Sequence, residues 1–485
     1  MTKRFFFSST GIAVPQAMLL AIDDHSLPLR RNLCYYISQP RVRPEPVLMP
    51  SRENPNAPDY LAAHFYGSVI YDAGKYRMWY YACHPGENAA DLREGPMCYA
   101  ESADGLEWYK PNLGLVEFKG SRANNVVDVP DLWTEGNFVI KDEADPDPAR
   151  RYKAAYNYRP AGRPWSIRTL TSPDGLRWQA APEGQFHTFI EHASLYKHDD
   201  LYFISGQMFE RSEGGHNQGR QSYVIVSPDF DHWVQESGEG FMLPEPADPV
   251  LRGYGKPYDQ CHIGIGAAPF GNVLVGLYCI WHNREVFEEI SGDLGLLVSN
   301  DGLHFREPVK GHVFLASTDT PVTPGPGNRW PTVLCQTNAM FNVGDVTRIY
   351  HGRWRNTPYG EEYWAEVALA TLPRDRWGAL GLWPDQAEGA VWTCPVRLPE
   401  GGCRVVLNAD AAQEMHVEVA GERFNLLAGY SGEDAGSVAA EGGLDCPVTW
   451  PADSLERLSG QTVRFKVNLR RAGTREPRLY AVYLR

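Results

Sequence analysis

The feature that most constrains the fold is a short turn motif that recurs along the chain. Its copies span residues 102–108, 172–178, 227–233 and 299–305. Three copies read Ser-x-Asp-Gly with an aromatic ring three residues after the Gly, and the copy at 227–233 keeps the Ser, the Asp and the ring. Asp-Gly between two strands is a strong hairpin signal, because Gly adopts the positive φ that the turn requires. This argument makes the four turn carboxylates structural: Asp104, Asp174, Asp229 and Asp301.

A second hairpin precedes each turn motif, so each repeat holds about four strands. The clearest is 69–80, and a fifth copy spans 339–350 and turns at Gly344-Asp345. Five such units predict an all-β fold with a five-bladed β-propeller over residues 61–383, because radial repetition leaves only short, protected sheet edges. A chain with 46 Gly and 37 Pro suits many short strands joined by tight turns.

The two flanks of the repeats follow different patterns. Residues 384–485 contain alternating strands without the Ser-x-Asp-Gly turn, which predicts a small C-terminal β-sandwich packed on the propeller. Residues 1–60 are irregular and rich in Pro between positions 40 and 58. We expect this N-terminal segment to close the propeller with a strand or to shape its rim.

The charge and the cysteines limit the partners and the compartment. Lys and Arg total 46 against 60 Asp and Glu, a net charge of −14. This balance disfavours nucleic acid and acidic membrane surfaces, because both require clustered basic residues. No stretch approaches the ~20 apolar residues of a membrane span. Nine cysteines without a CxxC pair predict free, mostly buried thiols and a cytoplasmic protein. A homo-oligomer stays open.

Three segments, 67–80, 191–196 and 366–377, carry a family resemblance. They are similar to the first-blade hairpin, the third-blade inner strand and the last-blade ending of glycoside hydrolases of families 32 and 43. The resemblance implies a carbohydrate substrate and a propeller with an appended sandwich. The chain departs from family 32 at His64-Phe65-Tyr66-Gly67, where that family has Asn-Asp-Pro-Asn-Gly, and at Glu135-Gly136-Asn137-Phe138, where it has Arg-Asp-Pro.

Cleavage of a glycosidic bond needs two carboxyl groups. One protonates the leaving oxygen, and the other acts as base or nucleophile, at ~5 Å separation for retention and ~6.5–9.5 Å for inversion. Glu191 is the best candidate acid, because it opens the third inner strand beside apolar neighbours that would raise its pKa. Asp59 and Asp259 precede or open the inner strands of blades one and four and are the candidates for the second carboxylate. The predicted activity is exo-acting hydrolysis of a furanoside or short oligosaccharide, with the stereochemical outcome open.

The predicted substrate-binding residues are histidines, tryptophans, arginines and one further carboxylate at the ends of the inner strands. Aromatic rings suit the apolar faces of sugars, and Arg suits hydroxyl-rich or carboxylate groups. The set is His64, Glu135, His192, His262, Trp281, Arg329, Trp330, Arg353 and Trp354.

Two alternatives stay open beside hydrolysis by two carboxylates. His64, His192 and His262 fall at corresponding points of three blades, and three neutral imidazoles could hold a divalent metal for a carbohydrate lyase or hydrolase. The chain could also be a sugar-binding propeller without catalysis, since the first-blade Asp of family 32 is missing. The main prediction includes no metal and no cofactor, because the sequence has no P-loop, dinucleotide fingerprint or zinc spacing.

Overall fold

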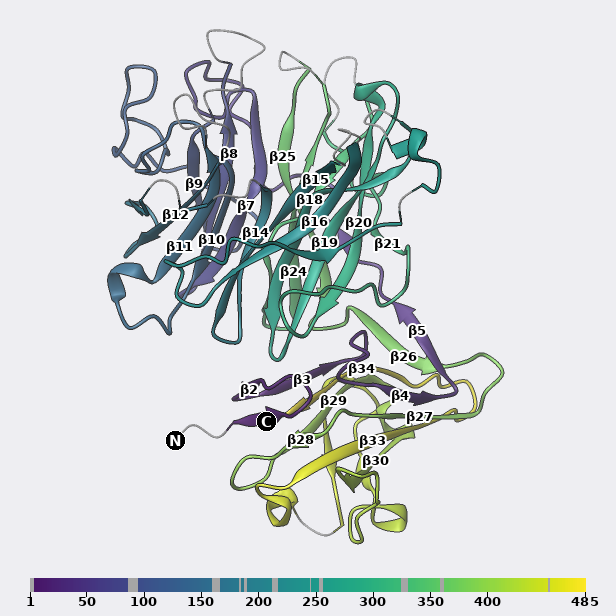
Figure 1. Ribbon diagram of the computed structural model, residues 1–485. Coiled ribbons are helices and arrows are strands. Elements are labelled where there is room, and N and C mark those ends of the chain that lie inside the picture. Colours follow the sequence, from purple (N-terminus) through teal and green to yellow (C-terminus); the bar gives the residue numbers. More distant parts are fainter. Residues whose placement is uncertain are drawn as a thin grey trace.

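The protein is all-β and forms two bodies, which we describe from a computed structural model (Figure 1). The structure describes residues 4–85, 95–158, 166–182, 185–186, 190–211, 217–244, 246–252, 256–323, 330–357, 362–451 and 454–485. Within these ranges the helical segments are 3-10 turns of three or four residues. No helix there is long and apolar enough to cross a membrane.

The large body begins with three separate antiparallel sheets. The first contains β7 (Ala62–Asp72), β8 (Lys75–Cys83) and β9 (Met97–Ser102). The second contains β10 (Glu135–Lys141), β11 (Tyr152–Tyr158), β12 (Ser166–Ser172) and β13 (Gln179–Ala180). The third contains β14 (Glu191–His198), β15 (Leu201–Arg211), β16 (Asn217–Ser227) and β17 (Gly238–Phe241).

The rest of the large body is one nine-stranded sheet made of two halves. One half contains β18 (Asp259–Phe270), β19 (Val273–His282), β20 (Ser291–Ser299) and β21 (Val313–Leu315). The other contains β22 (Val333–Cys335), β23 (Met340–Val343), β24 (Val346–Trp354), β25 (Ala365–Pro373) and β6 (Arg41–Val42). A single parallel pairing, Gly292 with Val333, joins the halves.

The innermost strands surround a common axis. Strand β7 contacts β10, β10 contacts β14, β14 contacts β18, and β18 contacts β23. Strands β24 and β25 contact β7, so the series of contacts closes on itself. The ends of these strands therefore meet at the two ends of the axis, where residues far apart in sequence become neighbours.

The repeated turns have the structural role that the sequence predicts. Each turn Asp accepts hydrogen bonds from two backbone N–H groups that follow it, at 2.7–2.9 Å. The turn carbonyls also link neighbouring sheets. Gly105 O accepts from Tyr350 Oη at 2.9 Å, Gly175 O from Trp79 Nε1 at 2.7 Å, and Gly302 O from Tyr196 Oη at 2.8 Å. The prediction that these carboxylates are structural is confirmed.

Replacing Asp174 by Ala should destabilise the second sheet without touching any cavity. The variant loses the bonds from Leu176 N and Arg177 N, at 2.8 and 2.9 Å, and charge-assisted bonds of this kind contribute about 2 kcal/mol. Urea unfolding followed by tryptophan fluorescence measures the loss. An unchanged midpoint would contradict a structural role for this carboxylate.

The small body unites both ends of the chain in one 14-stranded sheet system. Its N-terminal strands are β1 (Phe5–Phe7), β2 (Ala13–Val14), β3 (Ala17–Leu20), β4 (Leu29–Arg31) and β5 (Leu33–Ile37). Its C-terminal strands are β26 (Gly378–Leu382), β27 (Glu388–Trp392), β28 (Val396–Arg397), β29 (Val405–Asp410), β30 (Met415–Gly421), β31 (Gly436–Val438), β32 (Gly443–Thr449), β33 (Thr462–Arg470) and β34 (Arg478–Leu484).

The expectation for residues 1–60 needs correction. This segment is not irregular, because β1–β5 pair with strands of the small body, for example Leu19 with Val482. Strand β6 and residues after it join the large body: β6 pairs with β25 as its outer strand, and Leu48 forms a bridge with Val367. Strand β26 lies before the expected boundary at 383/384 but also belongs to the small body. The alternation of polar and apolar residues cannot predict that these strands belong to the small body, because the strands they pair with lie far away in the sequence.

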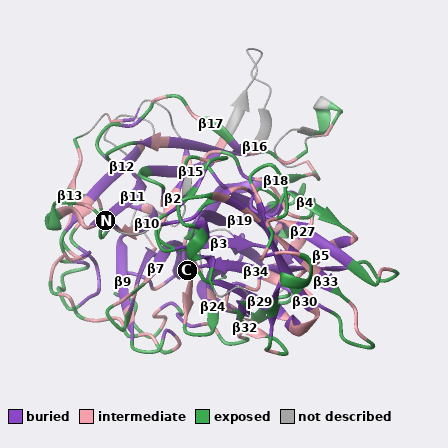
Figure 2. Cartoon of the chain, turned by 90° about the horizontal axis from the view of Figure 1, so that it is seen from below, coloured by how far each residue is buried: buried purple, intermediate pink, exposed green. Residues whose placement is uncertain are grey.

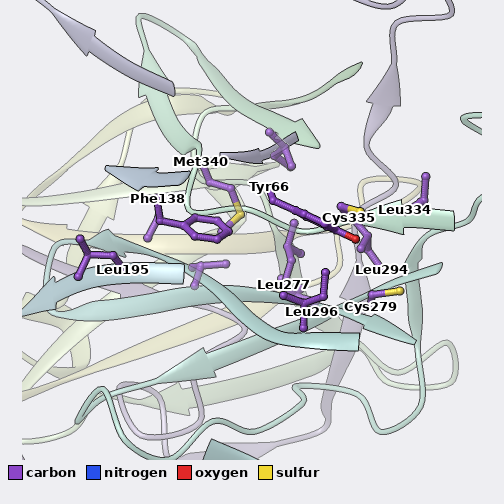
Figure 3. Close-up of a cluster of buried hydrophobic side chains, with 14 of the residues drawn as sticks. Tyr66, Phe138, Leu195, Leu277, Cys279, Leu294, Leu296, Leu334, Cys335 and Met340 are labelled. Carbon is purple, nitrogen blue, oxygen red and sulfur yellow. The ribbon is translucent and has the colours of Figure 1, made fainter. Parts of the chain in front are cut away.

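The small body has a hydrophobic cluster of its own, and the main cluster of the large body extends to small-body residues such as Leu20, Ala481 and Tyr483. Strands of both are largely buried, and exposed residues concentrate in the connecting loops (Figure 2). The main cluster of the large body includes Tyr66 and Cys335, which lie together near its axis (Figure 3). All nine cysteines are free and seven of them are buried, so the prediction of free, mostly buried thiols is confirmed.

Candidate functional site

A cavity of about 330 Å³ opens at one end of the axis of the large body. We call it the axial cavity. It brings together six of the residues predicted to form the site, which come from strands of four different sheet units. Its lining is His64, Tyr66, Tyr81, Glu135, Glu191, Arg220, His262, Trp281, Phe287, Trp354, Asn356, Thr357 and Tyr363.

Four inner strands each have a β-bulge near the axial cavity, and these bulges orient the side chains of the site. The register shifts at His64/Ser68 in β7, Glu135/Phe138 in β10, His192/Ser194 in β14 and His262/Ile265 in β18. A bulge bends its strand and changes the direction of a side chain, and bulges are common beside active sites. In β18 the shift includes Ile263 at φ 65° and Gly264 at φ 95°. Each bulge therefore follows a residue of the candidate site.

Polar side chains close the channel below the axial cavity. Ser68 Oγ donates to Asn338 Oδ1 at 2.7 Å, and Asn338 Nδ2 donates to Leu195 O at 2.9 Å and Val139 O at 3.3 Å. Beyond this cross-link a second cavity, of about 320 Å³, is lined by the other halves of the same strands. Asn338 lines this second cavity and not the axial one.

Glu191 lies at the start of β14 and is partly buried in the cavity wall. Burial raises the pKa of its carboxyl group, and the charge of Arg220 and a hydrogen bond from Gln207 Nε2 oppose this shift. Gln207 is itself fixed, since its Oε1 accepts from Ile263 N at 2.8 Å. A carboxyl group with a raised pKa can keep a proton near neutral pH and give it to a leaving group.

Glu135 is the second carboxylate of the axial cavity. It opens β10, before Gly136 at φ 78°. Tyr66 lies close to both carboxylates: burial raises the pKa of its hydroxyl well above 10, and the charges of Glu135 and Glu191 raise it further. Two carboxylates from different sheets thus share one small cavity.

The two described cavity histidines are neutral. Burial lowers the pKa of His64 to about 3. Burial, the charge of Arg220 and the proximity of His64 hold the pKa of His262 well below its usual range. His64 Nδ1 has no hydrogen-bond partner among the described residues, although the side chain is 2% exposed. A ligand with a hydroxyl group could satisfy this atom.

The third member of the predicted histidine triad, His192, lies in β14, but its side chain is outside the described part of the structure. Within the described residues no group of three or more His, Cys, Asp or Glu side chains is arranged to hold a metal ion.

Aromatic rings form much of the cavity wall. The ring centroid of Trp354 lies 5.1 Å from that of His64, 6.2 Å from that of His262 and 6.4 Å from that of Trp281. Tyr363 lies 6.3 Å from Trp354. Such a wall packs against the C–H faces of a sugar ring, while the carboxylates and histidines bind its hydroxyl groups.

Asp59, predicted as a possible second carboxylate, lies elsewhere. It is 1% exposed and does not line the axial cavity. Its Oδ2 accepts from Lys110 Nζ at 2.5 Å and from Tyr80 Oη at 3.0 Å. Lys110 comes from the loop after β9, so no local sequence pattern predicts this buried pair. We assign Asp59 a structural role instead.

Asp259, the other predicted second carboxylate, also lies outside the cavity lining. Its side chain is half-exposed and its Oδ1 lies 2.7 Å from His282 Nδ1. Asp293 Oδ2 lies 2.9 Å from the other ring nitrogen. In the β18–β19 pairing Asp259 stands opposite His282, one position from the pair Gln260–Trp281, and so faces the other side of the sheet. The three residues link β18, β19 and β20 at their ends.

The Asp259–His282–Asp293 cluster predicts a pH dependence of stability. The hydrogen bonds that the His282 ring donates to the two carboxylates raise its pKa from 6.5 to about 9. The folded state holds this proton more tightly, so the stabilisation is complete below pH 6.5 and is lost as pH rises towards 9. We expect a loss of about 2 kcal/mol over this interval, allowing for solvent screening at Asp259. Urea unfolding of the parent and of His282→Gln at pH 6.5 to 9 measures this loss. An equal change of the free energy of unfolding with pH in both proteins would contradict the assignment.

The remaining predicted residues are not in the cavity lining. Arg353 is buried and its Nε donates to Glu366 Oε1 at 2.5 Å. This is a structural ion pair, so the prediction that Arg353 contacts substrate is wrong. Trp330 Nε1 donates to Glu362 Oε2 at 3.2 Å, away from the lining. Arg329 lies outside the described residues.

Sequence reasoning missed Tyr66, Arg220, Gln207 and Tyr363. Tyr66 stands within the first-blade segment, and only the bulge of β7 turns it into the cavity. Arg220 lies on the third strand of its sheet, where a propeller argument expects no axial residue. Its guanidinium reaches the cavity by lying 5.1 Å from the Trp281 ring. A polar residue next to a predicted bulge is the only signal that could have marked Tyr66.

No protein-family model matches the chain, and neither does any curated protein. Solved structures match at low identity. One is reported for the GH130 family of mannoside phosphorylases, which contains glycoside hydrolases that target β-1,2 mannosidic linkages in Candida mannan (TM-score 0.45, 15% identity, 70% of this chain and 95% of that chain). Another is a glycosyl hydrolase from Bacteroides ovatus (0.42, 13%, 71% and 95%). A third is an N-acetylgalactosamine deacetylase from F. plautii (0.45, 12%, 72% and 97%). Function must therefore be argued from the residues of this chain.

Proposed function

We propose that the protein is a glycoside hydrolase whose active site is the axial cavity. The observation that carries this proposal is that Glu135 and Glu191 line one aromatic-walled pocket, where burial raises the pKa of Glu191. Glu191 is the general acid, as its sequence position suggests. Glu135 takes the role of second carboxylate, in place of Asp59 or Asp259.

The proposed reaction places one carboxyl group on each side of the glycosidic bond. Glu191 gives its proton to the glycosidic oxygen as the bond to the anomeric carbon breaks. Glu135 either takes a proton from the attacking water, which inverts the anomeric carbon, or attacks that carbon itself to form a covalent glycosyl-enzyme. In the second case water, deprotonated by Glu191, displaces Glu135 in a second inversion, which restores the original configuration. Gln207 favours transfer, because its N–H bond to Glu191 strengthens as the carboxylate becomes charged.

The proposed substrate is a furanoside or short oligosaccharide that is cleaved from its end. The small volume of the axial cavity, about 330 Å³, supports exo action, because it suits a terminal sugar better than a polymer. Trp281 and Trp354 are proposed to stack on the terminal sugar, with His64 Nδ1 on one of its hydroxyl groups.

The same proposal includes the finer architecture. The large body is a five-bladed β-propeller related to families 32 and 43, with β22–β25 and β6 as the fifth blade. The small body is a β-sandwich built from both chain ends. The closed series of inner-strand contacts and the hydrophobic cluster within the small body support this interpretation.

A glycan panel tests the proposed function. Turnover is followed by release of monosaccharide, and proton NMR of the fresh product gives its anomeric configuration. We expect terminal cleavage of at least one glycan, with equal rates before and after chelation of divalent metals. Loss of activity on chelation would instead favour the metal-dependent alternative. Quenching of tryptophan fluorescence without any turnover would favour a binding protein.

A further inference from the structure

Three residues of the axial cavity form a chain of hydrogen bonds across three sheets. Arg220 Nη1 lies 3.0 Å from His262 Nδ1, and His262 Nε2 lies 3.3 Å from Tyr66 Oη. Arg220 is on β16, His262 on β18 and Tyr66 on β7. The proposed reaction assigns none of them a role in proton placement.

The chemistry of the groups fixes the direction of this chain. A guanidinium has only N–H donors and stays charged, so His262 Nδ1 must accept from Arg220. The imidazole is neutral, because burial and the charge of Arg220 lower its pKa. Its one proton is therefore on Nε2, which donates to Tyr66 Oη.

The surrounding structure holds His262 in this position. Gln336 Nε2 donates to His262 O at 2.6 Å and to Gly264 O at 2.8 Å, across the bulge of β18. The His262 ring also packs against Trp281, with centroids 4.2 Å apart. The ring is 4% exposed, so its orientation is set before any ligand binds.

Tyr66 is left with its own proton to donate. Its hydroxyl accepts from His262, and the ring is packed against His64 with centroids 4.0 Å apart. The groups around the hydroxyl are Cys335, Tyr363, Glu135 and Glu191, and the Cys335 thiol lies within hydrogen-bonding reach of it. A thiol is a weak acceptor, so a carboxylate or a substrate oxygen is the better partner for this proton.

We propose that Tyr66 is an oriented hydrogen-bond donor to a substrate oxygen held beside Glu135 and Glu191. Arg220 and His262 are positioning residues that set the direction of its O–H bond. That the ligand is a sugar rests on the proposed function. The direction of the hydrogen bonds from Arg220 through His262 to Tyr66 is independent of it. The substrate feature that Tyr66 would recognise is an oxygen acceptor next to the scissile bond.

The first experiment needs no substrate. Nitrogen NMR of protein labelled at its histidines, assigned through loss of one signal in His262→Gln, reports which ring nitrogen carries the proton. At neutral pH we expect His262 to be neutral with the proton on Nε2, and the Arg220→Met variant to show both tautomers. A proton on Nδ1, or on both nitrogens, would overturn the proposal.

The second experiment tests the role of the chain in turnover. Tyr66→Phe removes one hydroxyl and should lower kcat/KM about tenfold. His262→Gln should also lower it, but should add little in the Tyr66→Phe background, because His262 acts through Tyr66. Tyr196→Phe is the matched control: it removes a buried hydroxyl from another inner strand that lines the second cavity. Additive losses in the double variant would contradict the positioning role.

The two proposals fail in different ways. If no glycan is cleaved but the Nε2 tautomer is found, the proposed function fails and the chain direction stands. If Glu191→Gln abolishes cleavage while Tyr66→Phe turns over like the parent, the donor role of Tyr66 fails and the hydrolase stands.

Discussion

Replacing Glu191 by Gln should lower kcat by about 10²–10⁴-fold, the usual contribution of general acid catalysis. The amide keeps the shape of the side chain but has no acidic proton for the leaving oxygen. The oxygen of the new amide can still accept from Gln207 Nε2, so the fold should hold. The descending limb of the pH–rate profile, placed above the ordinary range of Glu by burial, should disappear with the carboxyl group. Steady-state kinetics on any cleaved glycan measures both effects.

Two further variants make this result specific. Glu135→Gln should also abolish turnover, because it removes the base or nucleophile. Glu418→Gln removes a buried carboxylate of the small body that accepts from Lys466 Nζ at 2.8 Å and Asn468 Nδ2 at 2.9 Å, and it should turn over like the parent. A kcat of Glu191→Gln equal to that of the parent would contradict the two-carboxylate mechanism.

Replacing Arg353 by Met should destabilise the large body by about 3–5 kcal/mol. Arg353 and Glu366 are 1% and 0% exposed, and the Nε–Oε1 distance is 2.5 Å. Removing the guanidinium leaves a buried carboxylate without its counter-charge, although Thr323 N still donates to it at 2.9 Å. Urea unfolding measures the change.

An exposed ion pair supplies the control for this prediction. Arg470 and Glu388 are 3.8 Å apart with side chains 73% and 64% exposed, so Arg470→Met should change the free energy of unfolding by less than about 0.5 kcal/mol. The double variant Arg353→Met/Glu366→Gln should recover part of the loss, because no uncompensated charge remains. Equal, small effects of Arg353→Met and Arg470→Met would contradict the burial argument.

Local patterns predicted the repeated units well. The Asp174 turn could be predicted from the sequence because the hydrogen bonds of its carboxylate all lie within three residues. The hairpin at 69–80 appears as β7 and β8, with Ala73 and Gly74 at positive φ between them. Such features depend on backbone preferences that neighbouring residues set alone.

The site was predicted only in part, because its members are positioned over long distances. Glu191 and His262 were found from their places at the starts of inner strands. Asp59 was mistaken for a site residue because its partner Lys110 lies 51 residues away. Arg353 was mistaken in the same way, since its pairing with Glu366 joins β24 to β25. A one-residue change in strand register reverses the side that a residue faces, so bulges decided which polar residues enter the cavity.

The most direct test of the central claim is a crystal structure of Glu191→Gln with an uncleaved oligosaccharide. We predict that the terminal sugar fills the axial cavity against Trp281 and Trp354. The glycosidic oxygen should lie within hydrogen-bond distance of the amide at position 191, with Glu135 on the other side of the anomeric carbon. A sugar bound elsewhere, or one whose glycosidic oxygen is out of reach of position 191, would contradict the account.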